Sequence, residues 1–187
     1  MDTGEPKPNL RKTVVLVGMM GSGKTAIGRA LAAALDVAFL DSDAAIEEAA
    51  ALSIAEIFAR DGEAFFRARE AEVIDRLLSG PPAILSTGGG AFLAQRNRDV
   101  IAQKGVAVLL DADLKTLWER VRHKNTRPLL RTPDPLATLT ELMEIRAPIY
   151  AKAQLHVPIL PSASIEETTR SVINILAQTP DILEQTT

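Results

Sequence analysis

The sequence of 187 residues contains no cysteine, and only 4% of its residues are aromatic. Without cysteine the chain has no disulfide scaffold, no thiolate nucleophile and no cysteine-ligated zinc or iron–sulfur site. Its chemistry must therefore come from oxygen and nitrogen groups or from a bound ion. The same absence fits a reducing cytoplasm, which is the expected location.

An excess of positive charge is also lacking, because 21 lysines and arginines face 24 aspartates and glutamates and the formal net charge is -3. Non-specific binding to a polyanion needs clustered lysine and arginine, so we expect no nucleic-acid partner and only local anion sites. No apolar run approaches the ~20 residues that cross a bilayer, and residues 1–12 lack the apolar stretch of a secretory signal. No membrane partner is expected either.

The length suits one domain of roughly 150–200 residues, whose core needs no disulfide or structural metal. Residues 1–12 are polar and rich in proline, and residues 179–187 have no regular pattern. Both ends are therefore predicted to be disordered tails around a single domain at 13–178. We expect this domain to act as a monomer.

Short apolar runs alternate with longer segments of helical period, which is typical of an α/β fold with a parallel sheet covered by helices on both faces. The predicted strands are 13–17, 37–40, 83–86, 106–110 and 155–159. The predicted helices include one that opens at the capping box of Ser53 and Glu56 and ends at Gly62, then 63–78, one near 136–146, and one that opens at the capping box of Ser164 and Glu167. The proline-containing segment 121–136 has little periodicity and is predicted to be a mobile lid.

The strongest motif is GMMGSGKT at 18–25, which matches GxxxxGK[ST] directly after the first predicted strand. Its glycines let successive N–H groups point inward, and the following helix adds its positive end, so the loop is predicted to bind a polyphosphate. Lys24 would reach the β- and γ-phosphates, and the Thr25 hydroxyl would join the coordination of Mg²⁺. The alternative is a glycine-rich turn that only connects strand to helix, and the presence of both Lys24 and Thr25 disfavours it.

Polar groups also follow the second and third predicted strands, namely Asp41 with Asp43 and the glycine triplet at 88–90. Ligands collect at the carboxyl ends of parallel strands, so these groups should share one crevice with the loop at 18–25. Two carboxylates there can hold the waters of a metal ion and orient a hydroxyl nucleophile, and the triplet offers N–H groups at close approach. The alternatives are that one of the two carboxylates only caps the next helix, a position that Ser42 or Asp43 would suit, and that the triplet is a mobile turn.

Arginines in three other segments complete the pattern. Arg67 and Arg146 carry planar forks that match a carboxylate, which indicates an anionic co-substrate, although a solvated helix face is the alternative for either one. Arg127 suits a lid that supplies positive charge to the transition state. Arg120 is expected to lie flat on the adenine.

Together, GMMGSGKT, DSD at 41–43, SIAEIFARDGEAFFRARE, STGGG, NTRPLL and RAPIY resemble the shikimate kinase family over residues 13–160. The resemblance implies a three-layer P-loop kinase fold, similar to that of nucleoside-monophosphate kinases, with five parallel strands in the order 2-3-1-4-5. It also implies ATP- and Mg²⁺-dependent phosphorylation of the 3-hydroxyl of shikimate to shikimate 3-phosphate, in aromatic amino-acid biosynthesis. ATP and shikimate would be the small-molecule partners.

Carried onto this chain, the family pattern makes Lys24, Asp43 and Arg127 catalytic. The implied nucleotide site is Gly21, Ser22, Gly23, Lys24, Thr25, Ala26, Arg120 and Arg127. The implied shikimate site uses the segment 43–78 and comprises Asp43, Phe58, Phe66, Arg67, Gly88, Gly89, Gly90 and Arg146, with Glu70 orienting Arg67. The resemblance implies that Thr25, and Asp41 through water, hold Mg²⁺. The resemblance also implies that the loop at 161–165 lies on the adenine side, and no contact is assigned to its residues.

Two other functions fit parts of this pattern. A gluconate-type small-molecule kinase would share Lys24 and Thr25 but would not need Arg67 and Arg146 beside the glycine triplet. A nucleotide-binding regulatory module would have lost phosphoryl transfer, and the presence of Asp43 and Arg127 argues against it.

Overall fold

The structure is a computed structural model that describes residues 8–124 and 127–184. Its central sheet has five parallel strands, β2 (Thr13–Val17), β3 (Phe39–Asp41), β4 (Ile84–Ser86), β5 (Gly105–Ala112) and β6 (Leu155–Ile159). The strand order is β3-β4-β2-β5-β6. Numbered along the predicted strands, this is 2-3-1-4-5, so the predicted fold class and strand order are confirmed.

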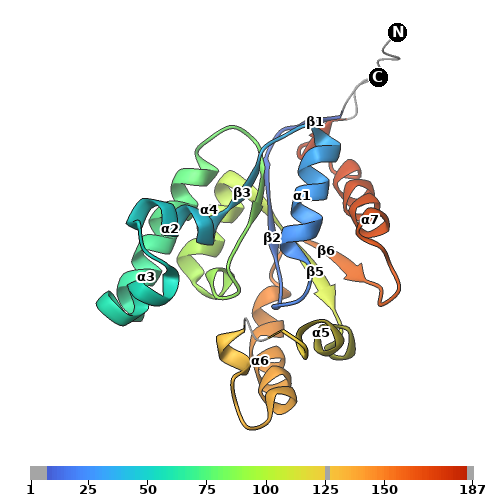
Figure 1. Cartoon of the computed structure of the whole chain (residues 1–187). Helices are drawn as coiled ribbons and strands as arrows, with labels where there is room; N and C mark the ends of the chain where they lie inside the picture. Colours follow the sequence, from blue (N-terminus) through green and yellow to red (C-terminus); the bar gives the residue numbers. More distant parts are fainter. Residues whose placement is uncertain (1–7, 125–126, 185–187) are drawn as a thin grey trace.

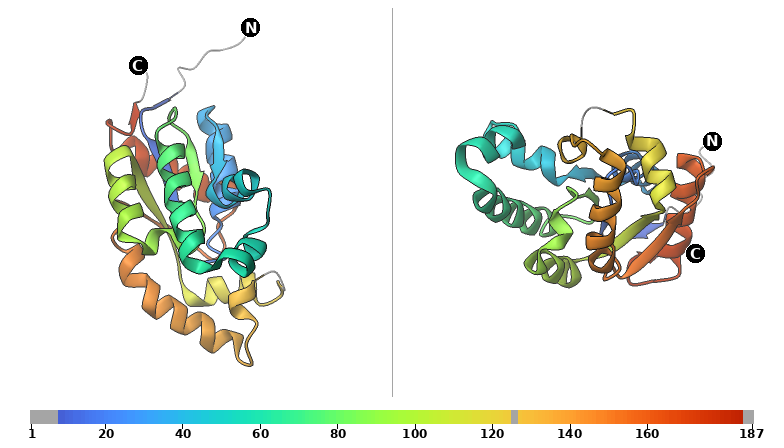
Figure 2. Two further views of the ribbon diagram at one scale, coloured as in Figure 1. Left: turned by 90° about the vertical axis from the view of Figure 1, so that its left-hand side faces the viewer. Right: turned by 90° about the horizontal axis from the view of Figure 1, so that it is seen from below.

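Helices cover both faces of the sheet, as Figures 1 and 2 show. On one face α1 (Lys24–Leu35) packs against α7 (Ile165–Ala177), and on the other α3 (Ile54–Leu78) packs against α4 (Gln95–Lys104). Central strands such as β2 are wholly buried and consist of Thr, Val and Leu, as expected for a strand covered on both sides.

The remaining helices lie at the edges of this sandwich. The short α2 (Ser42–Ala50) packs on α3 beyond the β3 edge, around a small apolar cluster that includes Ile46, Ile57 and Phe66. At the carboxyl ends of the strands lie α5 (Leu114–Val121), α6 (Pro135–Tyr150) and the 3-10 turns η1 (Ala91–Leu93) and η2 (Pro128–Leu130). These edge elements therefore surround the end of the sheet where ligands are expected.

The strand bounds differ from the prediction at three places. The strand predicted at 83–86 begins one residue later, as β4 (Ile84–Ser86). The strand predicted at 37–40 is β3 at Phe39–Asp41, because the Val37 N–H still donates to the Ala32 carbonyl at the end of α1, with Asp36 in the left-handed conformation (φ 56°). The strand predicted at 106–110 extends over Gly105–Ala112 because β6 pairs with its second half.

The helix predictions hold with similar adjustments. Both capping boxes form, and Gly62 (φ 83°) interrupts α3 between the two helices predicted there. The helix expected near 136–146 is longer and runs from Pro135 to Tyr150. In the segment 121–136, residues 125–126 lie outside the described part, and η2 is a defined turn.

The predicted tails are wrong at their inner ends. Strand β1 (Asn9–Leu10) pairs antiparallel with β7 (Leu183–Glu184), and Leu10 and Leu183 are buried. Arg11 forms an ion pair of 2.6 Å with Glu184 on the surface. Each of these two strands has too few apolar residues to be predicted from the sequence. They form because each end of the chain supplies the hydrogen-bonding partner of the other. Residues 1–7 and 185–187, which the tail prediction also covered, lie outside the described part.

This terminal pairing predicts unequal effects of two neighbouring substitutions. Leu183→Ala should lower the free energy of unfolding by about 2–4 kcal/mol, because it leaves a cavity at a fully buried position. Glu184→Ala should cost much less than Leu183→Ala, because its ion pair with Arg11 is exposed. Urea unfolding of both variants measures this, and equal effects would contradict a packed terminal sheet.

Candidate active site

The loop between β2 and α1 has the backbone geometry of an anion cradle. Gly18, Gly21 and Gly23 all have positive φ, at 144°, 81° and 96°. Residues other than glycine rarely adopt these φ angles, so the glycines allow the loop to take this conformation. The first helical residue of α1 is Lys24, and the N–H groups of the first turn have no earlier helical partner. The loop and helix together can therefore receive a polyphosphate.

Lys24 is held against this loop. Its Nζ donates to the Gly18 carbonyl at 2.8 Å and to the Met19 carbonyl at 3.1 Å. Burial, followed by the positive charge of Arg127, lowers the pKa of Lys24 to about 8. A bound polyanion would reverse this effect, since negative charge favours the protonated amine.

The loop borders a cleft of about 690 Å³, here called the P-loop cleft. Of the predicted nucleotide residues, those that line it are Gly21, Gly23, Lys24, Thr25, Ala26, Arg120 and Arg127. Ser22 does not line it, because its side chain is fully buried and its N–H donates to the Met19 carbonyl. Arg120 reaches over the loop, and its Nη1 donates to the Gly21 carbonyl at 3.1 Å.

The P-loop cleft includes residues to which no contact was assigned from the sequence. They come from the loop before α7 and its first turns, Ala163, Ser164, Ile165 and Thr168, and from Lys124. The capping box at Ser164 located the helix start, but nothing in its residue types indicated a ligand. Ile165 is half exposed there, so it offers an apolar surface to whatever fills this end of the cleft.

The acidic pair divides its roles. Asp41 is the residue that caps α2, since its Oδ1 accepts hydrogen bonds from the N–H groups of Asp43 and Ala44 at 2.9 and 3.1 Å. The alternative that one of the two carboxylates caps the next helix is thus confirmed for Asp41, and Ser42 and Asp43 were the wrong residues for that cap. Asp43 is left to face the cavity, where burial and then the negative charge of Asp41 raise its pKa to about 6.

A second cavity of about 310 Å³, here called the triplet cavity, adjoins the first. All of the predicted shikimate residues line it, namely Asp43, Phe58, Phe66, Arg67, Gly88, Gly89, Gly90 and Arg146. Leu129 and Pro128 of η2 and Ile54 of α3 also line it and were not predicted. The rings of Phe58 and Phe66 pack with their centroids 4.7 Å apart and form an apolar wall.

Each glycine of the triplet meets a different charged side chain. A Cβ on Gly88 would lie 2.6 Å from an Asp43 oxygen, and one on Gly90 would lie 2.5 Å from Arg67 Nη2. A Cβ on Gly89 would lie 3.4 Å from Arg146 Nη1. The triplet is therefore a close-packed backbone surface, and the alternative of a merely mobile turn does not explain these contacts.

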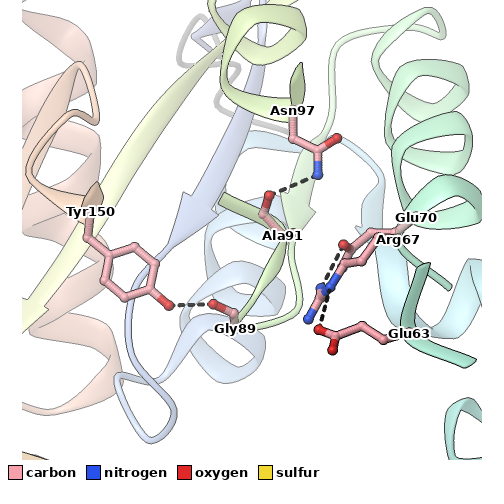
Figure 3. Close-up of polar contacts among 7 residues, drawn as sticks. All are labelled: Glu63, Arg67, Glu70, Gly89, Ala91, Asn97 and Tyr150. Atoms are coloured by element: carbon pink, nitrogen blue, oxygen red, sulfur yellow. Dashed lines mark hydrogen bonds and ion pairs between the residues drawn. The ribbon is translucent and has the colours of Figure 1, made fainter. Parts of the chain in front are cut away.

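Arg67 is oriented from its own helix. Its Nη1 lies 2.8 Å from Glu70 Oε2, and its Nε lies 3.6 Å from Glu63, as Figure 3 shows. Glu70 is only 1% exposed, and burial raises its pKa despite the hydrogen bond from Arg67. Glu70 thus fixes one edge of the guanidinium and leaves Nη2 directed at Gly90.

The two cavities meet at a shared set of residues, Met20, Asp43, Gly88, Gly89 and Arg127. Arg127 Nε is buried there and has no hydrogen-bond partner within the described residues. A buried guanidinium N–H without an acceptor costs free energy, unless a bound ligand accepts its hydrogen bond. Asp43 and Arg127 therefore stand where a group would pass from the P-loop cleft to an acceptor in the triplet cavity.

The described residues contain neither a cluster of metal-ligating side chains nor a membrane-spanning helix. Over 8–124 and 127–184, no group of three or more His, Asp or Glu side chains could hold a metal ion. No helix in that part of the chain is long and apolar enough to span a bilayer.

A P-loop on a five-stranded parallel sheet, beside a cavity lined by Arg67 and Arg146, is the arrangement of a small-molecule kinase, an enzyme that transfers a phosphoryl group. The chain belongs to the shikimate kinase family, whose family model matches residues 20–177.

Known proteins support this assignment. A shikimate kinase of Ruegeria pomeroyi is 63% identical over 94% of this chain and 90% of its own length. A solved structure of shikimate kinase from Acinetobacter baumannii in complex with shikimate has a TM-score of 0.83 and 34% identity, covering 89% of this chain and 93% of that one. A gluconokinase structure from Sinorhizobium meliloti, at 21% identity and TM-score 0.59 over 91% of this chain and 94% of that one, shares the fold alone.

The raised pKa of Asp43 predicts a pH-dependent gain in stability from Asp43→Asn. A carboxyl whose folded pKa is raised contributes stability below its unfolded value, near 3.8, and this contribution is lost as the pH rises through about 6. The variant should therefore melt at a higher temperature than the parent at pH 8 and at nearly the same temperature at pH 4. Thermal unfolding at both values measures this, and an equal difference at both pH values would contradict the assignment.

Proposed function

We propose that this protein transfers the γ-phosphoryl group of ATP to the 3-hydroxyl of shikimate and so forms shikimate 3-phosphate, a step of aromatic amino-acid biosynthesis. The observation that carries the proposal is the pair of guanidinium groups, Arg67 and Arg146, that face the glycine triplet in a cavity opening onto the P-loop cleft. Two arginine forks suit the carboxylate of the acceptor, and the apolar wall suits its ring. The proposal includes a monomeric enzyme in the cytoplasm.

The P-loop cleft would take the nucleotide. Lys24 and the N–H groups of the loop would hold the β- and γ-phosphates, and Arg120, already fixed to Gly21, would cover the adenine. The opposite side of the base would meet Ile165, which is half exposed. Because Ser22 donates its N–H to Met19, its part in phosphate binding stays a prediction.

The oxygen groups of Thr25 and Asp41 fit Mg²⁺. Both line the P-loop cleft, and Asp41 uses Oδ1 for the α2 cap, which leaves Oδ2 for a water of the ion. When bound with ATP, Mg²⁺ supplies charge neutralisation to the phosphates.

Asp43 would accept the proton of the attacking hydroxyl. Its pKa of about 6 leaves it ionised at neutral pH and close enough to that pH to act as a base. Arg127 would bring positive charge to the transferring phosphoryl group, with its unpaired Nε available for an oxygen. The closure of the segment 121–136 over the site stays a prediction.

An assay of ADP release tests the proposed activity directly. The purified protein with ATP and Mg²⁺ should release ADP rapidly with shikimate and only at background level with gluconate or with no acceptor. Phosphorus NMR of the product should show a phosphate ester at the 3-position. Turnover of gluconate would favour the gluconate-type alternative, and no turnover with any acceptor would favour the regulatory module.

Arg67 and Arg146 are here called the acceptor clamp. Replacing either arginine of the clamp by lysine should weaken shikimate binding selectively. Arg67→Lys and Arg146→Lys each remove a bidentate fork, which should cost about 1.5–3 kcal/mol, or roughly tenfold or more in Kd. ATP affinity should change little. Arg69→Lys is the matched control, since Arg69 lies on the same helix but pairs with Glu72 at the surface. Calorimetric titration of both ligands gives the values, and normal shikimate binding by both variants would rule out this pocket.

Arg127→Ala should act on the chemical step. We expect kcat to fall by about 10³-fold or more, as when a supplied arginine is removed from other phosphoryl-transfer enzymes, while shikimate affinity stays nearly constant. Arg122→Ala, at an exposed position after α5, serves as the control. Single-turnover transfer at the parent rate in Arg127→Ala would remove this residue from catalysis.

A further inference from the structure

The glycine triplet is held from behind by a residue outside the predicted site. The hydroxyl of Tyr150, at the end of α6, donates a hydrogen bond to the Gly89 carbonyl, as Figure 3 shows. Tyr150 is only 3% exposed, and its ring stacks on Phe92 of η1 with centroids 6.5 Å apart. The ring is thus fixed by packing, and the hydroxyl is the part that reaches the loop.

This bond determines the direction of the next N–H group. A trans peptide is planar, so the N–H of Gly90 points opposite to the carbonyl of Gly89. In Figure 3 the carbonyl points toward Tyr150, and Arg67 lies on the other side of the loop. The Gly90 N–H is therefore turned toward the Arg67 side, where the triplet cavity lies. Among the described residues it donates no hydrogen bond, so a ligand can accept it.

Arg146 is connected to the same hydroxyl. It lies one turn before Tyr150 on α6, and a Cβ on Gly89 would lie 3.4 Å from its Nη1. Burial raises the pKa of Tyr150, and the nearby positive charge of Arg146 opposes that rise. The Tyr150 side chain therefore lies between Arg146 and the glycine triplet, and it does not itself line the triplet cavity.

The turn around the Gly89–Gly90 peptide is closed by a hydrogen bond of 3.2 Å from the Ala91 N–H to the Gly88 carbonyl. Without the Tyr150 hydroxyl, this peptide could still change its orientation within the turn. A peptide between two glycines has wide access to other φ and ψ values, so its orientation needs an external partner. On the far side of the triplet, Asn97 is buried and donates to the Ala91 carbonyl at 2.8 Å, which holds η1 but leaves the Gly89–Gly90 peptide to Tyr150.

We propose that Tyr150 is a positioning residue for the acceptor. The Tyr150 hydroxyl orients the Gly89–Gly90 peptide so that the Gly90 N–H faces the triplet cavity, which Arg146 also lines. This role rests on the proposed function, because the acceptor it serves is shikimate. It assigns no contact between Tyr150 and the substrate.

The substitution Tyr150→Phe tests the role while keeping the stacked ring. Loss of one hydrogen bond that preorganises the loop should raise the KM and Kd for shikimate roughly three- to tenfold. The KM for ATP should stay within about twofold, and kcat should change less than the KM for shikimate. A shikimate KM equal to that of the parent would overturn the proposal.

Thr13→Val is a matched control for lost stability. Thr13 is buried in β2, and its hydroxyl accepts a hydrogen bond from the Ala83 N–H, away from both cavities. It should lower the melting temperature without changing either KM. If Tyr150→Phe raises the KM values for shikimate and ATP by the same factor, its effect is general destabilisation and the positioning role is wrong.

A spectroscopic test avoids substitution altogether. The sequence contains one tyrosine, so labelling tyrosine with ¹³C at Cζ gives a single resonance. Shikimate should shift this resonance, and a non-hydrolysable ATP analogue alone should not. No shift in a parent enzyme that phosphorylates shikimate would defeat only the positioning role. A parent enzyme that neither binds nor phosphorylates shikimate would defeat the proposed function as well.

Discussion

The close approach of the glycine triplet to Asp43 and Arg67 is the constraint on which the acceptor site depends. The triplet follows β4, Asp43 lies in the first turn of α2, and Arg67 lies in α3, so three separate elements converge on a few atoms of backbone. Any Cβ at Gly88 or Gly90 would collide with these charged groups at 2.5–2.6 Å. The absence of side chains therefore sets the spacing of the site.

Convergence of this kind gathers charge in a partly dry cavity, which disfavours the ionised forms. The effect is visible in Asp43, whose pKa rises to about 6, and in Lys24, whose pKa falls to about 8. The buried Glu70 needs Arg67 as its partner, and the Nε of Arg127 has none among the described residues. The negative charge of a phosphorylated ligand would stabilise the two cationic groups, Lys24 and Arg127, which both line the P-loop cleft.

The α6 helix links the two halves of the site. It begins after the segment that carries Arg127, packs on both η1 and η2, and ends with Arg146 and Tyr150 beside the triplet. A movement of η2 toward the nucleotide would therefore act on the same helix that positions the acceptor clamp. Rigid support comes from the sheet, since β2 and β4 pair directly and place the P-loop next to the triplet.

The sequence by itself determined the strand and helix pattern, the P-loop and, through its family resemblance, the set of predicted shikimate residues that line one cavity. These features are written in local spacing or in motifs, which a single chain displays without folding. Only the tertiary structure decided that Asp41 caps α2, that Ile165 reaches the P-loop cleft, that the chain ends pair, and that Tyr150 holds Gly89. Most of these features depend on contacts between residues that are distant in the chain and meet only after packing. The α2 cap depends on which of several neighbouring residues packing places at the start of the helix.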